Sequence, residues 1–268
     1  MIVYSSHDSS TGDISTSKGN QIKMRTGEFW FKADYMGYEG AAEYLSSHLL
    51  KYTNIDNYVV YELEAMEIND TEYSGCRSRN FLSDDCSLVT LDRLFLSYKN
   101  SSIEDQIEGL ELHEAIKHIV DEVINITGLK DFGKLLTKWF EFDKFILNED
   151  RHFNNIAVIY NNKEKAFDYC PLFDNGAAFL SDTRNDYPLG ENPLKQAQKV
   201  KAKPFTKSFD IQVKACHDLY GEQLEIDSNI CISPEVYNNI SDMYGNQIAE
   251  RLSALFDRQC RFAGISRN

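Results

Sequence analysis

A polar stretch in the middle of the chain reads Asp150-Arg151-His152-Phe153-Asn154-Asn155. It lies between an apolar segment that ends near Asn148 and a β-rich run that begins at Ile156. Carboxylate and amide oxygens are the ligands that Mg²⁺ prefers, and a carboxylate can also orient a hydroxyl group and accept its proton. The spacing Asp-x-x-x-x-Asn therefore suits a catalytic loop, with Asp150 as the base and Asn155 as a metal ligand. Taken alone, it is also typical of a surface loop between a helix and a strand.

The residues after this loop predict a β-hairpin that leads to a second candidate metal ligand. Strands are expected at 156–160 and 166–169, with a short turn between them. The chain then reads Phe173-Asp174-Asn175-Gly176. Phosphoryl transfer from ATP uses a carboxylate at such a place, because the metal ion bridges the phosphates there. We therefore predict that Asp174 and Asn155 hold the metal together.

A lysine at the end of an aromatic strand is the candidate for binding the phosphates. The run at 28–33 reads Glu-Phe-Trp-Phe-Lys-Ala and predicts a strand, and a helix is expected from about residue 41 to 52. Glu43 lies inside that helix, eleven residues after Lys32. A strand lysine paired with a helix glutamate is how kinases hold the lysine against the α- and β-phosphates. Glu43 is the preferred partner, and Glu39, just before the helix, is the alternative.

The segment 15–21 reads Ser-Thr-Ser-Lys-Gly-Asn-Gln and is the candidate loop for covering the phosphates. Hydroxyl and amide groups around one glycine can bind phosphate oxygens, so Ser17, Gly19 and Gln21 are predicted to contact the nucleotide. The segment matches neither the G-x-G-x-x-G pattern nor the Walker pattern. An ordinary polar turn is the alternative interpretation.

The order of the predicted elements divides the chain into two lobes. Residues 1–85 are rich in strands, with one helix among them, and form a small β-rich N-lobe. Residues 86–268 form a larger, mainly helical C-lobe, with helices expected at 110–126, at 132–148 and, as one C-terminal helix, at 234–263. The predicted fold class is α+β, a two-lobed protein-kinase-like fold. A chain of 268 residues is long enough for two such lobes to share a cleft.

The composition argues against several other classes of protein. The net charge of −14 disfavours a protein whose main task is to bind nucleic acid or an anionic membrane surface. No apolar run is long enough to span a bilayer, and no secretory signal opens the sequence. The six cysteines contain no C-x-x-C pair and are interpreted as small buried apolar residues, and the six histidines show no zinc-ligand spacing. These features favour the cytoplasm, with delivery elsewhere as an effector left open.

Six short motifs, spread over about residues 14 to 180, resemble those of a known family. They are Ser-Lys-Gly-Asn-Gln at 17–21, Phe-Lys-Ala-Asp at 31–34, Glu-Gly-Ala-Ala-Glu at 39–43, Gly-Cys-Arg-Ser-Arg-Asn-Phe at 75–81, Asn-Glu-Asp-Arg-His-Phe-Asn-Asn at 148–155 and Leu-Phe-Asp-Asn-Gly at 172–176. With these motifs the chain resembles the HipA-like kinases, an atypical bacterial branch of the protein kinases. Within that branch it looks closest to the short CtkA-type members.

The resemblance implies that ATP binds in the cleft, with Mg²⁺ on Asn155 and Asp174. By the same likeness Lys32 binds the phosphates and Asp150 is the catalytic base. The family also implies a protein serine/threonine kinase of toxin or effector type, whose partners are a protein substrate and an antitoxin or regulatory protein. Several such kinases are regulated by autophosphorylation in the phosphate loop. The candidate positions here are Ser15, Thr16 and Ser17.

Three features stay open at this level. The segment that holds the adenine ring is expected near Arg79-Asn80-Phe81, with Glu62-Leu63-Glu64 as the alternative. His152 can orient Asp150 or approach the metal, or it can simply bond to the backbone. The lysines between Lys195 and Lys207 are interpreted as a solvated face, although they could also dock an acidic substrate or a nucleic acid.

Two other functions compete with a protein kinase. A small-molecule phosphotransferase of the aminoglycoside-kinase type uses the same spacing of Asp and Asn and a downstream Asp, and an acidic acceptor pocket in the C-terminal half would favour it. A pseudokinase that only binds ligands is the other alternative, against which the intact Lys32, Asp150 and Asp174 argue. Asn175 stands where most eukaryotic kinases have Phe, so no Phe-driven switch is expected.

Overall fold

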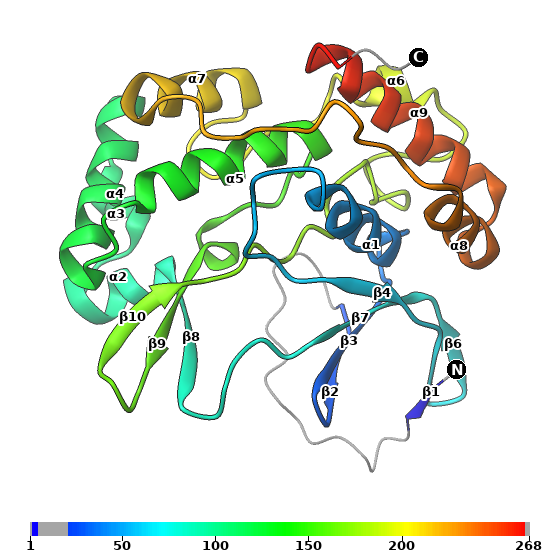
Figure 1. Cartoon of the computed structure of the whole chain (residues 1–268), viewed down its shortest axis with the longest axis horizontal. Helices are drawn as coiled ribbons and strands as arrows, with labels where there is room; N and C mark the ends of the chain where they lie inside the picture. Colours follow the sequence, from blue (N-terminus) through cyan, green and yellow to red (C-terminus); the bar gives the residue numbers. More distant parts are fainter. Residues whose placement is uncertain (1, 5–20, 266–268) are drawn as a thin grey trace.

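The computed structural model describes residues 2–4 and 21–265. Strands dominate the first part of the described chain and helices the remainder (Figure 1). This order agrees with the α+β class expected from the sequence.

An antiparallel four-stranded sheet is the centre of the N-terminal part. Its strands lie in the order β2-β3-β7-β4. Their bounds are Lys23–Thr26 for β2, Phe29–Ala33 for β3, Gly75–Arg79 for β7 and Tyr61–Leu63 for β4. A second sheet contains β1 (Ile2–Tyr4), β5 (Met66–Ile68) and β6 (Thr71–Tyr73) in the order β1-β5-β6. Helix α1 (Glu39–Leu50) follows β3.

The two faces of the four-stranded sheet have different tasks. Phe31 and Ala33 on one face pack against Met66 and Ile68 of the second sheet. Because side chains alternate along a strand and directly paired residues share a face, the register fixes what the other face carries. Its members include Lys23, Trp30, Lys32, Cys76 and Ser78. This second face is the one that contributes to the site.

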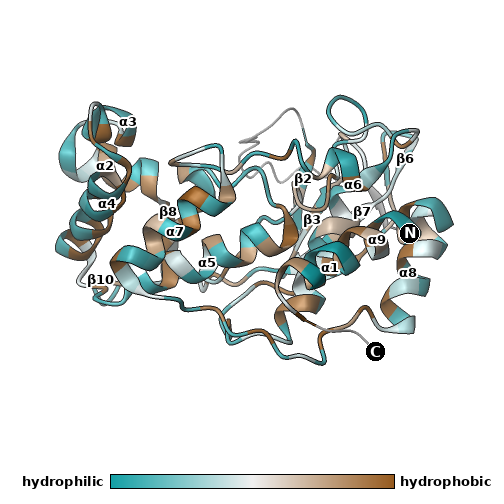
Figure 2. Ribbon diagram, turned by 90° about the horizontal axis from the view of Figure 1, so that it is seen from above, coloured by the Kyte–Doolittle hydropathy of each residue, from teal (hydrophilic) through white to brown (hydrophobic). Residues whose placement is uncertain are grey.

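The C-terminal part contains a small sheet and most of the helices. Strand β8 (Cys86–Thr90), which the sequence pattern did not reveal, pairs with the expected hairpin of β9 (Ala157–Asn161) and β10 (Ala166–Tyr169). The helices are α2 (Leu91–Lys99), α3 (Ile103–Ile107), α4 (Leu112–Thr127), α5 (Phe132–Ile146), α6 (Pro193–Gln196), α7 (Phe209–Tyr220), α8 (Pro234–Tyr244) and α9 (Asn246–Phe262). A single 3₁₀ turn, Phe153–Asn155, ends the polar loop. Helix α4 carries both hydrophilic and hydrophobic residues, as an amphipathic helix should (Figure 2).

The C-terminal residues form two helices, so the single helix expected at 234–263 was wrong. Gly245 ends α8 with φ +85° and ψ 160°, a backbone conformation that favours glycine. Helix α9 begins directly after it and packs back against α8. The periodicity of apolar residues continues across the break, which is why the sequence pattern did not show it.

The main apolar core runs through both parts of the molecule. Buried residues of α1, such as Leu45 and Leu49, belong to the same cluster as Trp139 and Phe140 of α5 and Leu252 of α9. Helix α1 also contacts α8, beside which it lies in Figure 1. Residues 80–85 connect β7 to β8, where we expected the lobes to divide. The division at residue 85 stays a prediction, and α1 is anchored to the helical part.

Two smaller observations complete the description. All six cysteines are free, and four of them are buried, as expected of small apolar side chains. Within the described ranges, no helix combines the length and the apolar character needed to cross a membrane.

Candidate active site

Lys32 on β3 is held by two carboxylates that come from different parts of the chain. Its Nζ atom lies 2.5 Å from Oε1 of Glu43 on α1 and 2.7 Å from Oδ1 of Asp174. Glu43 is 1% exposed and the Lys32 side chain 11%, so the pair is buried. Glu39, the alternative partner, instead accepts hydrogen bonds from the backbone of residues 35–37 at the start of α1. The structure therefore brings together Lys32, Glu43 and Asp174.

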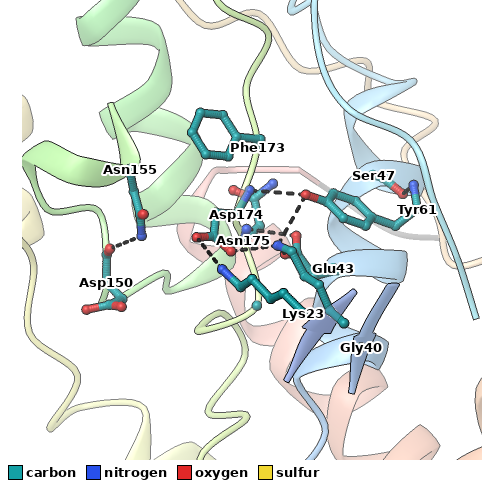
Figure 3. A network of polar contacts seen from close by, with 12 residues as sticks. Lys23, Gly40, Glu43, Ser47, Tyr61, Asp150, Asn155, Phe173, Asp174 and Asn175 are labelled. Carbon is teal, nitrogen blue, oxygen red and sulfur yellow. Dashed lines mark hydrogen bonds and ion pairs between the residues drawn. The ribbon is translucent and has the colours of Figure 1, made fainter. Parts of the chain in front are cut away.

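The charges of this cluster stabilise one another. Burial alone would lower the pKa of the Lys32 ammonium, but Asp174 and Glu43 outweigh it and raise that pKa well above its usual range. Burial would likewise raise the pKa of Asp174, yet Lys23 and Lys32 hold it well below its usual range. Lys23 lies opposite Lys32 in the register, with Nζ 3.8 Å from Oδ2 of Asp174 (Figure 3). Lys32 and Asp174 are thus both charged near neutral pH.

The backbone at Asp174 is fixed from two sides. Asp174 has φ +59°, a left-handed conformation that Asp and Asn tolerate better than most residues. Its N–H donates to the hydroxyl of Tyr61 on β4 at 3.4 Å, and the N–H of Asn175 donates to Oε2 of Glu43 at 2.8 Å (Figure 3). The acidic side chain is therefore positioned by the N-terminal sheet and α1, although it follows the C-terminal hairpin.

The polar loop at 150–155 presents the second half of the site. The Nδ2 atom of Asn155 donates to the backbone carbonyl of Asp150 at 2.9 Å (Figure 3). Because this bond uses the nitrogen, the Oδ1 atom of Asn155 points away from that carbonyl. Asp150 is 5% exposed, and its N–H donates to Oδ1 of Asn148. His152 accepts a backbone hydrogen bond from Asn154, and its Nε2 lies 3.7 Å from Oδ2 of Asp150. Burial lowers the pKa of the His152 imidazole. The nearby Asp150 carboxylate raises this pKa but does not cancel the effect of burial.

Arg151 holds the loop to its surroundings, a role that the sequence pattern did not suggest. The side chain is fully buried, and its Nε and Nη2 atoms each lie 2.9 Å from the carboxylate of Asp143 on α5. Nη1 donates to the carbonyl of Phe173 at 2.7 Å, and Nη2 donates to Oδ1 of Asn175 at 2.6 Å. One guanidinium thus links α5, the polar loop at 150–155 and the segment that carries Asp174. It also gives Asn175 a task, where a Phe would offer no acceptor.

The lysine stretch after residue 195 contributes one residue to the site. Lys203 Nζ lies 2.7 Å from Oδ1 of Asp150. The interpretation of this stretch as a solvated face is therefore wrong for Lys203, while Lys201 and Lys207 are exposed. A contact across 53 residues leaves no local signal in the sequence.

The residues expected to hold the adenine ring divide between two places. The Arg79 side chain lies on the face of the sheet that carries Phe31, not on the face of Lys32; it lies over the ring of Phe29 and pairs with Glu28. Asn80 instead accepts a hydrogen bond from the Trp30 indole, and the Phe81 ring lies 6.1 Å from that of Phe173. Among the alternative residues, Glu62 and Glu64 pair with Arg77. Phe81 therefore lies against Phe173, while Trp30 is bonded to Asn80, the neighbour of Phe81.

A pocket joins the two halves of the site. Its lining includes Asp150, Asn155 and Asp174, together with Gln21. Other carboxylates along its wall belong to Glu39, Glu149 and Asp182. Of the predicted phosphate loop, Gln21 is therefore placed at the pocket, while Ser15, Thr16, Ser17 and Gly19 lie outside the described residues.

The donor groups at this pocket suit Mg²⁺. Asn155 and Asp174 offer an amide and a carboxylate oxygen, which are hard ligands. Mg²⁺ usually takes one or two protein ligands and completes its shell with water and phosphate oxygens. Across residues 21–265, no three His, Cys, Asp or Glu side chains gather closely enough to hold a metal alone. A metal here would take its further ligands from water or from the phosphates of a bound nucleotide.

The fold is protein-kinase-like. It combines a β-sheet that carries the lysine of a Lys–Glu pair, the Asp-x-x-x-x-Asn loop and an Asp after a hairpin. Among solved structures, the chain is similar to the proinflammatory kinase CtkA from Helicobacter pylori. The likeness covers 95% of this chain and 92% of that one, with a TM-score of 0.65 and 17% sequence identity. No protein-family model and no curated protein matches the sequence. The resemblance expected from the six motifs is confirmed in the fold.

Proposed function

We propose that this chain is an ATP- and Mg²⁺-dependent protein serine/threonine kinase. The observation that carries the proposal is that Asp150, Asn155 and Asp174 line one pocket, and that Asp174 is bonded to Lys32, which also bonds to Glu43. Holding the reacting groups in place before the substrates bind supplies much of the catalysis in phosphoryl transfer. The fold shared with CtkA supports the same class of chemistry.

Each residue has a defined task in this proposal. Asp150 accepts the proton of the acceptor hydroxyl, whose oxygen forms a bond to the γ-phosphorus while the bond to the bridging oxygen of ADP breaks. Lys32, kept charged by its two carboxylates, binds the α- and β-phosphates, and Lys23 beside it adds a second cation. Asn155 and Asp174 hold Mg²⁺, which when bound neutralises charge on the phosphates. The rings of Trp30, Phe81 and Phe173 pack around the adenine of ATP.

The acceptor in this proposal is a serine or threonine, including those of the chain itself. Gln21 lines the pocket beside Asp150, and the Ser/Thr-rich residues 15–17 precede it by a few positions. We place autophosphorylation at Ser15, Thr16 or Ser17. A protein substrate, and an antitoxin or regulatory protein that binds this toxin- or effector-type kinase, are its proposed partners.

Mass spectrometry of the purified chain after incubation with Mg·ATP tests this function. We expect phosphate on a serine or threonine of residues 15–17 in the wild type and none in Asp150→Ala. Asp168→Ala is the matched control, because Asp168 is an exposed carboxylate of β10 that bonds only to its neighbour's backbone in the described contacts. Equal phosphate in the wild type and Asp150→Ala would remove Asp150 as the base.

The acidic wall of the pocket supports a second candidate function. Glu39, Glu149 and Asp182 line the same pocket as Asp150, and carboxylates of this kind attract a cationic acceptor. A small-molecule phosphotransferase for amino sugars would use such a wall. ATP consumption that rises with an aminoglycoside and not with a protein acceptor would favour this function over the protein kinase.

A further inference from the structure

We infer that Lys203, which lies 53 residues after the catalytic base Asp150, binds the γ-phosphate of ATP. This inference rests on the proposed function. Lys203 Nζ lies 2.7 Å from Oδ1 of Asp150, an aspartate whose side chain is only 7% exposed, while that of Lys203 is 40% exposed. The ammonium therefore bonds to a carboxylate that lines the pocket, while its own side chain stays in contact with solvent.

The backbone that carries Lys203 is rigidly held. Gln212 of α7, which is 1% exposed, donates to the Lys203 carbonyl at 2.9 Å and accepts from the N–H of Phe205 at 3.2 Å. The Phe205 ring packs edge-on against Phe153 of the catalytic loop, with 5.4 Å between ring centroids, and against Phe140 of α5. The segment is thus packed against the very loop whose base Lys203 contacts. An unspecific surface lysine would not have this support.

Among the described residues, no other lysine or arginine is paired with Asp150. Arg151 is fully buried and directs its guanidinium to Asp143, Phe173 and Asn175. Lys32 and Lys23 bond to Asp174 on the side of the N-terminal sheet. Among the lysines and arginines in the described part of the chain, Lys203 is therefore the one that pairs with Asp150.

The chemistry of transfer explains why a cation belongs there. The base bonds to the acceptor hydroxyl, whose oxygen approaches the γ-phosphorus, so a cation bonded to the carboxylate of the base can reach the γ-phosphate. During transfer the new oxygen–phosphorus bond forms, the bond to ADP breaks, and the proton passes to Asp150. Lys203 stabilises the charge on the phosphate oxygens, which is the task of fixed cations in such reactions. Its flexible stem lets it bond to Asp150 and to the phosphate.

Comparing ATP with ADP tests this role, because only ATP carries the γ-phosphate. Calorimetric titration with Mg·ATP and Mg·ADP is combined with single-turnover phosphate transfer for the wild type, Lys203→Ala, Lys203→Arg and Lys201→Ala. Lys201 lies two residues away and is exposed, which makes it the matched control. We expect Lys203→Ala to weaken ATP binding by on the order of 10-fold, to leave ADP binding unchanged and to slow transfer by roughly 10²-fold. Lys203→Arg should restore part of the rate, and Lys201→Ala should behave as the wild type.

Three results would overturn the inference. Equal loss of ATP and ADP binding in Lys203→Ala would give the lysine a structural role only. Faster transfer in that variant would make it a group that blocks the base. If the wild type binds neither nucleotide, the nucleotide site itself fails, and the γ-phosphate role of Lys203 with it.

Discussion

The Nζ atom of Lys32 lies 2.7 Å from Oδ1 of Asp174, an ion pair between residues 142 positions apart in the chain. It joins β3 of the N-terminal sheet to the segment after the C-terminal hairpin. The same ammonium bonds to Glu43, which in turn accepts the N–H of Asn175. The sheet, α1 and the segment that carries Asp174 are therefore set relative to one another by one buried cluster.

Removing the lysine of this cluster should cost stability as well as activity. In Lys32→Met two buried carboxylates lose their shared cation, and breaking a buried pair in this way costs about 3–5 kcal/mol. Urea denaturation near neutral pH measures the change. Lys163→Met, in the exposed turn of the hairpin, is the control and should alter the free energy of unfolding by no more than about 0.5 kcal/mol. Indistinguishable results for the two variants would contradict the stabilising role of the cluster.

The depressed pKa of Asp174 predicts how stability depends on pH. Because the folded-state pKa lies below the unfolded-state value of about 3.9, the ionised carboxylate adds stability at pH values above about 3.9. That contribution is lost as the pH falls toward the folded-state pKa. Asp174→Asn, which keeps the left-handed backbone, should therefore be less stable than the wild type at about pH 6. The gap between their urea midpoints should narrow at about pH 3.5, and a constant gap would speak against the ion pair as its cause.

Gly40 fixes how closely α1 approaches the sheet. A Cβ atom at this position would lie 2.5 Å from the Gly75 carbonyl carbon and 2.7 Å from the Tyr244 hydroxyl. Alanine gains about 1 kcal/mol in helix propensity, but overpacking against backbone costs more, and we expect a net loss of about 1–3 kcal/mol. Phosphate transfer should fall too, because Glu43 lies one turn further along α1. Gly190→Ala, which meets no atom within 4 Å, is the control for thermal unfolding and transfer. Full activity in Gly40→Ala would show that the position of α1 is not critical.

Arg151 is expected to tolerate no replacement, including lysine. A lysine has one nitrogen in place of a planar fork, so it cannot bond to Asp143, Phe173 and Asn175 at once. Leaving a buried charged partner without its bonds costs about 2–5 kcal/mol. Arg151→Lys should lower both the melting temperature and the transfer rate, whereas the exposed Arg93→Lys should change neither. A transfer rate in Arg151→Lys close to that of Arg93→Lys would contradict the linking role.

The sequence predicted those parts of the site that have a local pattern. The spacing of Asp150 and Asn155, the hairpin before Asp174 and the strand ending in Lys32 all depend on neighbouring residues, and propensity and periodicity describe these well. The C-terminal break at Gly245 was missed because one glycine interrupts a periodic pattern without ending it. The pairs Arg151–Asp143 and Lys203–Asp150 form only in the tertiary fold, which no spacing in one sequence encodes. The same is true of Lys23, whose place opposite Lys32 depends on the strand register.

The most direct measurement of the central claim is the transfer of label from ATP radiolabelled on its γ-phosphate. The wild type, Asp150→Asn and Asp168→Asn are compared with Mg²⁺ and with a chelator, after far-ultraviolet circular dichroism has shown that all three are folded. We predict label on protein for the wild type and Asp168→Asn with Mg²⁺, and a loss of at least about 10²-fold with the chelator or in Asp150→Asn. Equal labelling of Asp150→Asn and the wild type, or no labelling of any acceptor by the wild type, would contradict the assignment of this site to phosphoryl transfer.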